Sequence, residues 1–204
     1  MDGVLIDSIE HMAAYFIENH PGVTNTAYRD LFIGNYLEES QKLKHLEVPR
    51  TEEERSERFA AYVDAKSQLP LFPGIRELLQ RLHESGILLI LNTSTYERSC
   101  LPTLERTGIR DLFDYIAAAD LSKSKEEKFA FLQKHYSLAS DEMLFVTDSL
   151  GDVREADAIG IPTVAVTWGV HDEKTFLNEP HAVLKQIVHT VPELEKYITT
   201  LARR

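Results

Sequence analysis

Four short stretches of the chain carry acidic, hydroxyl or lysine side chains of the types that handle a phosphate group and a divalent cation. Carboxylate oxygens are ligands that Mg²⁺ favours, a hydroxyl can donate to a phosphate oxygen, and a lysine supplies a positive charge. Phosphoryl transfer needs such positioned cations and donors more than it needs covalent chemistry from the protein. The candidate residues are, in chain order, Asp2 and Gly3, Thr93 and Ser94, Lys123, and Asp148 and Asp152.

The segment from residue 74 onward alternates between helical patterns and short apolar runs, and it predicts the elements that must position these residues. Apolar residues at helical spacing form a stripe over 75–82, which Gly86 ends. This alternation predicts βαβ units and a doubly wound parallel sheet, hence an α/β fold. The predicted strands cover 87–91, 115–118, 143–147 and 162–166. One predicted helix follows each of the first three strands, and these helices cover 97–107, 125–136 and 153–159.

The candidate residues fall where such a sheet binds ligands. Ligands of open parallel sheets bind at the carboxyl ends of the strands. Thr93 follows the first predicted strand and Asp148 follows the third, so we expect both at one edge of the sheet. Asp148 and Asp152 also have a purely structural interpretation, because a helix favours a capping carboxylate and an acid in its first turn.

Residues 9–73 have a different character, which predicts an inserted helical unit. The region 9–67 is polar with apolar residues at helical spacing, and no convincing strand pattern interrupts it. The sequence Leu-Pro-Leu-Phe-Pro-Gly at 69–74 then ends the helices. We therefore predict a core formed by residues 1–8 and 74–204, with a helical insertion and its linker at 9–73.

The composition is typical of a soluble globular protein and excludes several classes of partner. No run approaches the roughly 20 apolar residues of a membrane span. The net charge of −11 argues against nucleic acid, because phosphate backbones are bound by clustered Lys and Arg. Cys100 is the single cysteine and cannot form an internal disulfide, which favours a reduced, cytoplasmic location. The expected partner is therefore a small molecule, and the sequence does not indicate the oligomeric state.

Four motifs resemble those of the haloacid dehalogenase-like (HAD) phosphohydrolases, in the same order and with similar spacing. The opening run Met1–Ser8 resembles their first signature, F-D-x-D-G-V-L-x-D-S, with Asp2 at the second aspartate. The run Leu89–Ser94 is similar to the second motif, an apolar strand that ends in Thr or Ser. The run Phe145–Asp152 resembles the fourth, an acidic pair four residues apart, and Lys123 falls near the position of the third-motif lysine.

This resemblance implies a hydrolase that is Mg²⁺-dependent and acts on a small phosphate monoester through an aspartyl-phosphate intermediate. It implies that Asp2 is the general acid and base, and that its backbone carbonyl contacts the metal together with Asp148. Asp152 would hold a metal-bound water or orient the lysine. Because the dehalogenase branch has no acid at the position of Asp2, phosphate ester chemistry is favoured over dehalogenation.

The resemblance also implies which residues contact the transferred phosphate. Thr93 would donate its hydroxyl, with Gly3 and Ser94 near it, and Lys123 would add a positive charge. Lys125 is the alternative to Lys123, because the proline that commonly follows the family's lysine is absent here.

The resemblance further implies a Rossmann-like core with a small helical (C1-type) cap, as in the phosphoglycolate phosphatase and beta-phosphoglucomutase group. The family's nucleophile would be one residue before Met1, at the end of the first core strand, which we therefore expect to be largely missing from this chain. One hypothesis is that a segment of about ten residues precedes Met1. The other is a non-catalytic relative that binds a phosphate ligand. A phosphomutase would use the same core, and the cap residues do not name the substrate.

Overall fold

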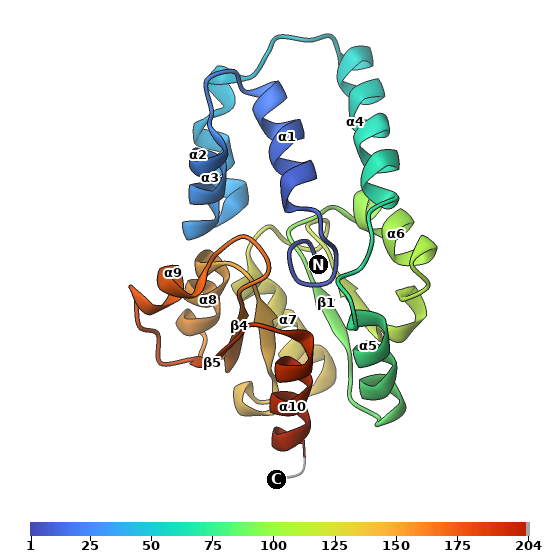
Figure 1. The fold of residues 1–204 in the computed structure, drawn as a ribbon, viewed down its shortest axis with the longest axis vertical. Helices are drawn as coiled ribbons and strands as arrows, with labels where there is room; N and C mark the ends of the chain where they lie inside the picture. Colours follow the sequence, from blue (N-terminus) through green and yellow to red (C-terminus); the bar gives the residue numbers. More distant parts are fainter. Residues whose placement is uncertain (203–204) are drawn as a thin grey trace.

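The computed structural model describes residues 1–202, so the last two residues of the predicted core range lie outside the described residues. A helical layer covers one end of an α/β core, in agreement with the predicted fold class (Figure 1). The helical layer contains α1 (Ile9–Asn19), α2 (Asn25–Asp30), η1 (Leu31–Ile33), α3 (Tyr36–Lys42), η2 (Lys44–Leu46) and α4 (Glu52–Ser67). The core contains α5 (Ile75–Glu84), β1 (Ile90–Asn92), α6 (Glu97–Arg106), η3 (Arg110–Leu112), β2 (Tyr115–Ala117), α7 (Lys125–Tyr136), η4 (Ser140–Glu142), β3 (Phe145–Thr147), α8 (Leu150–Ala158), β4 (Thr163–Val166), α9 (Glu173–Leu177), β5 (Leu184–Val188) and α10 (Val191–Leu201).

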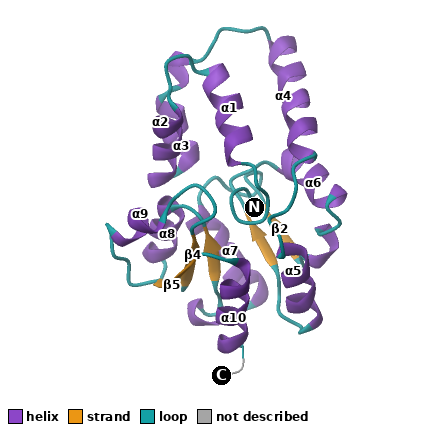
Figure 2. Ribbon diagram, in the orientation of Figure 1, coloured by secondary structure: helices purple, strands orange, loops and turns teal. Residues whose placement is uncertain are grey.

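The strands pair in parallel, as predicted, but they form two hydrogen-bonded sheets rather than one (Figure 2). In the first sheet β1 pairs with β2, with Leu91 opposite Ile116. In the second the order is β3-β4-β5, with Val146 opposite Val164. The segment before α1 forms a turn in which Ile6 makes only isolated bridges. One apolar cluster contains both Leu91 and Val164, so side chains of the two sheets share a core.

Helices cover both faces of the strands, and the alternation along β4 shows why. Val164 and Val166 belong to the apolar cluster that includes side chains of α5 and α10, whereas Ala165 between them belongs to the cluster that includes α7 and α8. Successive side chains of a strand point to opposite faces, so a fully apolar strand must be covered on both sides. β4 is buried along its whole length, which is the doubly wound arrangement expected for this sequence.

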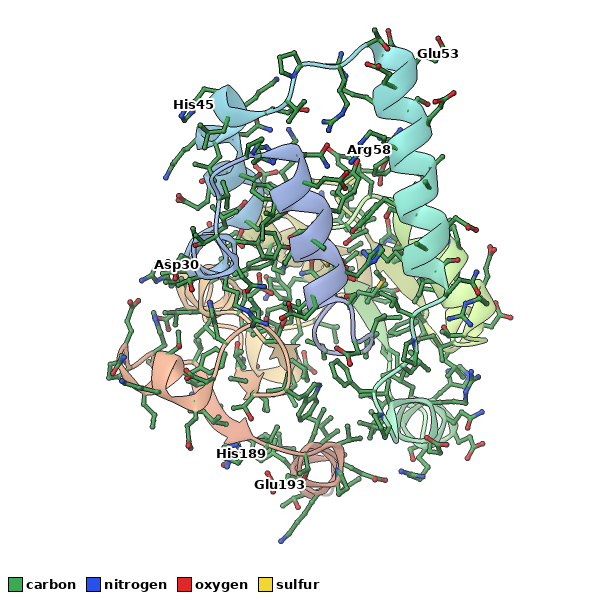
Figure 3. All side chains as sticks on the ribbon, turned by 45° about the horizontal axis from the view of Figure 1, so that its top comes forward. Asp30, His45, Glu53, Arg58, His189 and Glu193 are labelled. Atoms are coloured by element: carbon green, nitrogen blue, oxygen red, sulfur yellow. The ribbon has the colours of Figure 1, made fainter. Side chains whose placement is uncertain are left out.

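The helices α1 to α4 lie over the carboxyl ends of the strands and form the cap (Figure 1). The longest, α4, begins with a capping box in which Thr51 and Glu54 bond each other's backbone N–H groups. On α4, Arg58 lies between this helix and α1, where its Nη2 is 2.7 Å from Oε1 of Glu18 (Figure 3). Within residues 1–202, no helix combines the length and the apolar content that a membrane crossing requires.

Candidate active site

A cavity of about 80 Å³ lies between the cap and the carboxyl ends of the strands. Met12 and Tyr36 line it from the cap. The core residues that line it include the predicted site residues Asp2, Thr93, Ser94, Asp148 and Asp152, and also Lys125. The structure therefore brings together residues that are separated by up to 150 positions in the chain.

The carboxylate of Asp2 is compensated by donors on both of its oxygens. Ser8 Oγ donates to Oδ1 at 2.6 Å, and Lys66 Nζ lies 2.8 Å from the same oxygen. Thr95 Oγ1 donates to Oδ2 at 2.8 Å. Burial by itself raises the pKa of this carboxyl, but the positive charge of Lys66 and the donated hydrogen bonds outweigh burial and lower the pKa to about 2. Asp2 is thus ionised and held in one orientation.

Gly3 allows the turn that carries Asp2 to pack directly against Asp148. Its φ of +68° is a conformation that residues with a side chain rarely adopt. A Cβ at this position would overlap Oδ2 of Asp148. The visible role of Gly3 is therefore to bring two aspartates side by side; its predicted contact with a substrate remains a prediction.

Asp148 is only 7% exposed and has far less compensation than Asp2. The backbone N–H of Val170 donates to its Oδ2 at 2.8 Å. Among the described residues no side chain forms an ion pair with it. Burial raises the pKa of Asp148 to about 7, and the nearby negative charge of Asp152 adds to the increase, against the Val170 hydrogen bond.

The first turn of α8 shows whether Asp148 and Asp152 serve only as a helix cap and a first-turn acid. Ser149, not Asp148, caps this helix, because its Oγ accepts a hydrogen bond from the backbone N–H of Asp152 at 3.2 Å. The carboxylate of Asp152 lies in the first turn, accepts from Thr147 Oγ1 at 2.6 Å, and lies 3.0 Å from Lys125 Nζ. Asp148 is therefore available to the cavity rather than used as a cap.

The lysine that reaches the site is Lys125 and not Lys123. Lys123 is exposed and does not line the cavity. Lys125 is the first residue of α7 and is buried, and its Nζ donates to Ser94 Oγ at 2.9 Å besides contacting Asp152. Counting back from Asp148 therefore missed the lysine by two positions, because Ser124 caps α7 and the chain enters the site only at the helix start.

Thr93 and Ser94 follow β1, as predicted, and a second buried lysine donates a hydrogen bond to the backbone of Thr93. Thr93 Oγ1 accepts from the backbone N–H of Thr95 at 3.2 Å, so its own hydroxyl hydrogen is free to be donated. Lys128 Nζ donates to the Thr93 carbonyl at 2.6 Å. Burial, together with the charge of Lys125, lowers the pKa of Lys128 to about 7.

Several residues that hold the site were not predicted. Thr95 continues the hydroxyl run after β1 and could have been found from that run. Lys66 and Lys128 carry no such signal, because a buried lysine in a helix has the same sequence pattern as a solvated one. Asn92 was also missed: it lines the cavity, and its side-chain amide has no hydrogen-bond partner within residues 1–202.

The oxygen atoms at the site fit a hard divalent cation. Within residues 1–202 no three His, Cys, Asp or Glu side chains gather closely enough to hold a metal by themselves. Mg²⁺ does not require that, because it usually keeps several waters and takes one or two carboxylates. Asp148 is a buried carboxylate that forms no ion pair with a side chain of the described part of the chain, and Asp152 is near it, so this donor set suits such an ion.

Comparison with known proteins agrees with the geometry. The family model of the haloacid dehalogenase-like hydrolases matches residues 1–166. The chain belongs to this family. The match includes the cap and extends to the end of β4, so it covers all the residues that line the cavity.

Similar sequences include several phosphoglycolate phosphatases. One, from Pseudomonas fluorescens, is 33% identical over 127 residues, which cover 61% of this chain and about half (47%) of that protein. Another, from Pseudomonas savastanoi, is 26% identical over 94% of this chain and 76% of its own. A third, from Aliivibrio fischeri, is 29% identical over 90% of this chain and 88% of its own.

Solved structures of the same fold cover almost the whole chain. A predicted phosphatase from Clostridium acetobutylicum has a TM-score of 0.73 at 21% identity, over 98% of this chain and 95% of that one. A haloacid dehalogenase-like hydrolase from Streptococcus pneumoniae has a TM-score of 0.73 at 22% identity, over 97% and 95% of the two chains. At these identities the similarity establishes the fold alone.

Proposed function

We propose that this protein is a Mg²⁺-dependent phosphatase of small phosphate monoesters. The main support for the proposal is that an acidic group and phosphate-binding groups line the same cavity beneath the cap. Asp148 is a buried acid with no cationic side-chain partner among residues 1–202, and Lys125 and Thr93 are a cation and a hydroxyl that face the same space. A metal-bound phosphate group has the charge pattern that this pair of environments complements.

The phosphate would be bound by Lys125, Thr93 and Ser94. Lys125 supplies a fixed positive charge, because its Nζ is held by Ser94 Oγ and Asp152. Thr93 and Ser94 supply hydroxyl hydrogens at the end of β1. Donors that are already in position need no reorganisation when charge develops on the phosphate oxygens. This role passes to Lys125 from Lys123, which is exposed.

The metal would be held by Asp148, the backbone carbonyl of Asp2, and Asp152 through water. When bound, Mg²⁺ would supply the largest positive charge at the phosphate and would compensate the burial of Asp148. The chain's own residues do the rest: Gly3 keeps the two aspartates adjacent, and Val170 fixes one oxygen of Asp148.

Asp2 would act as the general acid and then the base toward the leaving group. Its carboxylate lies at the cavity wall and is held by donors on both oxygens, so its position is defined before substrate arrives. The nucleophile of the aspartyl-phosphate mechanism would be an aspartate one residue before Met1, as the motif pattern requires. Met1 itself lines the cavity, which is consistent with that location.

The cap restricts the substrate to a small molecule. Met12, Phe32 and Tyr36 line the cavity from above, so the leaving group would meet an apolar and aromatic surface. Phe32 and Tyr36 are stacked, with ring centroids 4.6 Å apart, which makes that surface rigid. Because similar proteins are phosphoglycolate phosphatases, phosphoglycolate is the first substrate to test.

The test compares two proteins: the present chain and one extended at its N-terminus by the codons that precede Met1. Magnesium-dependent phosphate release is measured with p-nitrophenyl phosphate and with phosphoglycolate, with D148N of each protein as the inactive control. We expect release from the extended protein, and its loss when an aspartate preceding Met1 is changed to Asn. Two folded proteins without release would overturn the proposal. Phosphate that reappears on a sugar product would indicate a mutase.

A further inference from the structure

Lys66 is a fully buried lysine that belongs to the cap but contacts the core. It is the second-last residue of α4, and its side chain is 1% exposed. Its Nζ forms an ion pair with Oδ1 of Asp2 at 2.8 Å, and the ring of Tyr62 on the same helix lies beside it, 5.9 Å away. A buried ammonium without a partner is costly, so this contact must form whenever α4 is in its present position.

In the position that α4 has here, its end also contacts the core outside this ion pair. The guanidinium of Arg106, at the end of α6, donates to the carbonyls of Ser67 and Leu69, one and three residues after Lys66. Helices α4 and α6 also pack against each other. The backbone at Lys66 is therefore held from the core side, and its ammonium has one described acceptor, Asp2, within reach.

Each donor to Asp2 comes from a different part of the molecule. Ser8 lies in the hinge that leads into α1, Thr95 lies after β1 in the core, and Lys66 lies in the cap. Of these three donors only Lys66 is carried by α4, so a movement of α4 away from the core, which would also break the Arg106 contacts, would remove Lys66 from Asp2. The orientation of the Asp2 carboxylate thus depends directly on where the cap is.

We propose that Lys66 is a positioning residue: it couples the closed position of cap helix α4 to the orientation of Asp2 for proton transfer to the leaving group. The proton-transfer part of this proposal rests on the proposed function, which assigns Asp2 as the general acid. Because the Asp2 carboxylate is ionised in the free protein, it first takes a proton from the monoanionic phosphate ester and then passes that proton to the leaving alkoxide oxygen; Lys66 exchanges no proton with substrate.

The first test uses the dependence on the leaving group in the extended, active protein. Removing the charge in K66M should lower kcat for an alkyl phosphate by about 10- to 100-fold, because an alkoxide needs a correctly placed acid. It should change kcat for 2,4-dinitrophenyl phosphate less than about threefold, because that group leaves without a proton. K66R should restore part of the alkyl phosphate rate, and K44M, an exposed lysine of the cap, should change neither. Equal losses on both substrates would overturn the proposal.

The second test needs no activity and uses Cys100 as a reporter. This thiol is buried on α6, the helix against which α4 packs, and it lies close enough to Asp2 and Lys66 for their charges to act on it, so separation of the two helices should increase its access to a disulfide reagent such as DTNB. Labelling far below the melting temperature should be at least about fivefold faster in K66M than in wild type. D2N should give a similar increase, and the double variant should be no faster than either single one, because one contact is removed in all three.

The two tests separate failure of this inference from failure of the proposed function. Two results would show that Lys66 does not couple α4 to Asp2. One is a Cys100 labelling rate in D2N/K66M whose increase over wild type is the product of the increases in the two single variants. The other is an unchanged labelling rate in K66M. A positive labelling result in a protein that hydrolyses no phosphate ester would instead refute the phosphatase while retaining the coupling.

Discussion

Asp2 and Asp148 both lie next to Gly3, yet the protein surrounds their charges in opposite ways. Asp2 receives two hydroxyl hydrogen bonds and the ammonium of Lys66, and its pKa falls to about 2. Asp148 receives a backbone N–H from Val170 and lies near Asp152, and burial raises its pKa to about 7. Two carboxylates in one cavity therefore have an acidity difference of several units.

The difference shows which charge the polypeptide completes and which it leaves for a ligand. A buried carboxylate is stable when donors and a cation surround it, and it is destabilising when they are absent. Asp2 already has its partners, so an added cation would compete with Lys66. Asp148 has none among the described side chains, so a divalent cation there would remove a penalty that the fold otherwise bears. The contrast therefore supports placing the proposed metal at Asp148 rather than at the carboxylate of Asp2.

The largest expected effect is on the residue that keeps the two aspartates adjacent. Gly3→Ala adds a Cβ that overlaps Oδ2 of Asp148 at a φ of +68°. We expect a loss of about 3 kcal/mol or more in the free energy of unfolding, measured by urea denaturation, from strain and overlap together. Gly22→Ala is the matched control, because Gly22 has a φ of +92° but no atom within 4 Å of the added Cβ. It should cost only about 1 kcal/mol. Equal losses in both variants would mean that the contact with Asp148 is not tight.

The next prediction sets the two aspartates against each other in metal-free buffer at pH 7. Asp148→Asn removes a disfavoured buried charge and should stabilise the protein by up to about 3 kcal/mol. Asp2→Asn leaves Lys66 buried and unpaired and should destabilise it by about 3 kcal/mol. Thermal unfolding of both variants measures this, and added Mg²⁺ should stabilise the wild type but not D148N. Destabilisation in both variants would remove the contrast.

The pH dependence follows from the same two shifts, with opposite signs. The folded-state pKa of Asp148 is raised to about 7, so metal-free stability from this group is full below about pH 4 and is lost as the pH rises to 7. The folded-state pKa of Asp2 is lowered to about 2, so its contribution is full above about pH 4 and is lost as the pH falls to 2. Unfolding curves of D148N and D2N across this range should each lack one of the two slopes.

A smaller effect distinguishes the two lysines near the start of α7. Lys125→Met removes the buried partner of Asp152 and Ser94, and we expect about a 100-fold lower kcat in the active protein, with a stability loss of about 1–3 kcal/mol. Lys123→Met changes an exposed side chain and should leave stability within about 0.5 kcal/mol and kcat unchanged. If K123M loses activity and K125M does not, Lys123 rather than Lys125 is the lysine that contacts the phosphate.

The sequence was sufficient to predict the elements whose signal is local. The strand β4 and the helix α7 are continuous, strongly patterned segments, and both were predicted to within one residue at each end. The strand β5 was not predicted, because Lys185 and Gln186 face solvent in its centre and interrupt the apolar run. The division of the strands into two sheets was also not predicted, since hydrogen bonding between distant strands leaves no local pattern.

The site residues that directly follow a strand could be predicted from the sequence motifs. The residues that reach the site only through tertiary packing were missed. Asp148 and Thr93 line the cavity as expected from strand ends. Lys66 was missed because nothing in α4 marks one lysine as buried among many charged residues. Lys125 was ranked second because a count of residues between motifs is less reliable than the helix cap that places the side chain.

The smallest predicted effect asks whether the cap also reaches Asp148. Arg29 of α2 donates from Nη1 to the Val170 carbonyl at 2.8 Å, and the N–H of Val170 is the donor to Asp148. Arg29→Met should therefore weaken Mg²⁺ affinity about two- to fivefold and cost about 1 kcal/mol of stability, measured by calorimetric titration and urea denaturation. Glu10→Gln is the control, because Glu10 binds the same guanidinium but not the loop. If E10Q weakens Mg²⁺ as much as R29M, the effect comes from packing of α1 on α2. If only R29M does, the cap holds both aspartates, Asp2 directly through Lys66 and Asp148 through the backbone of a single residue, Val170.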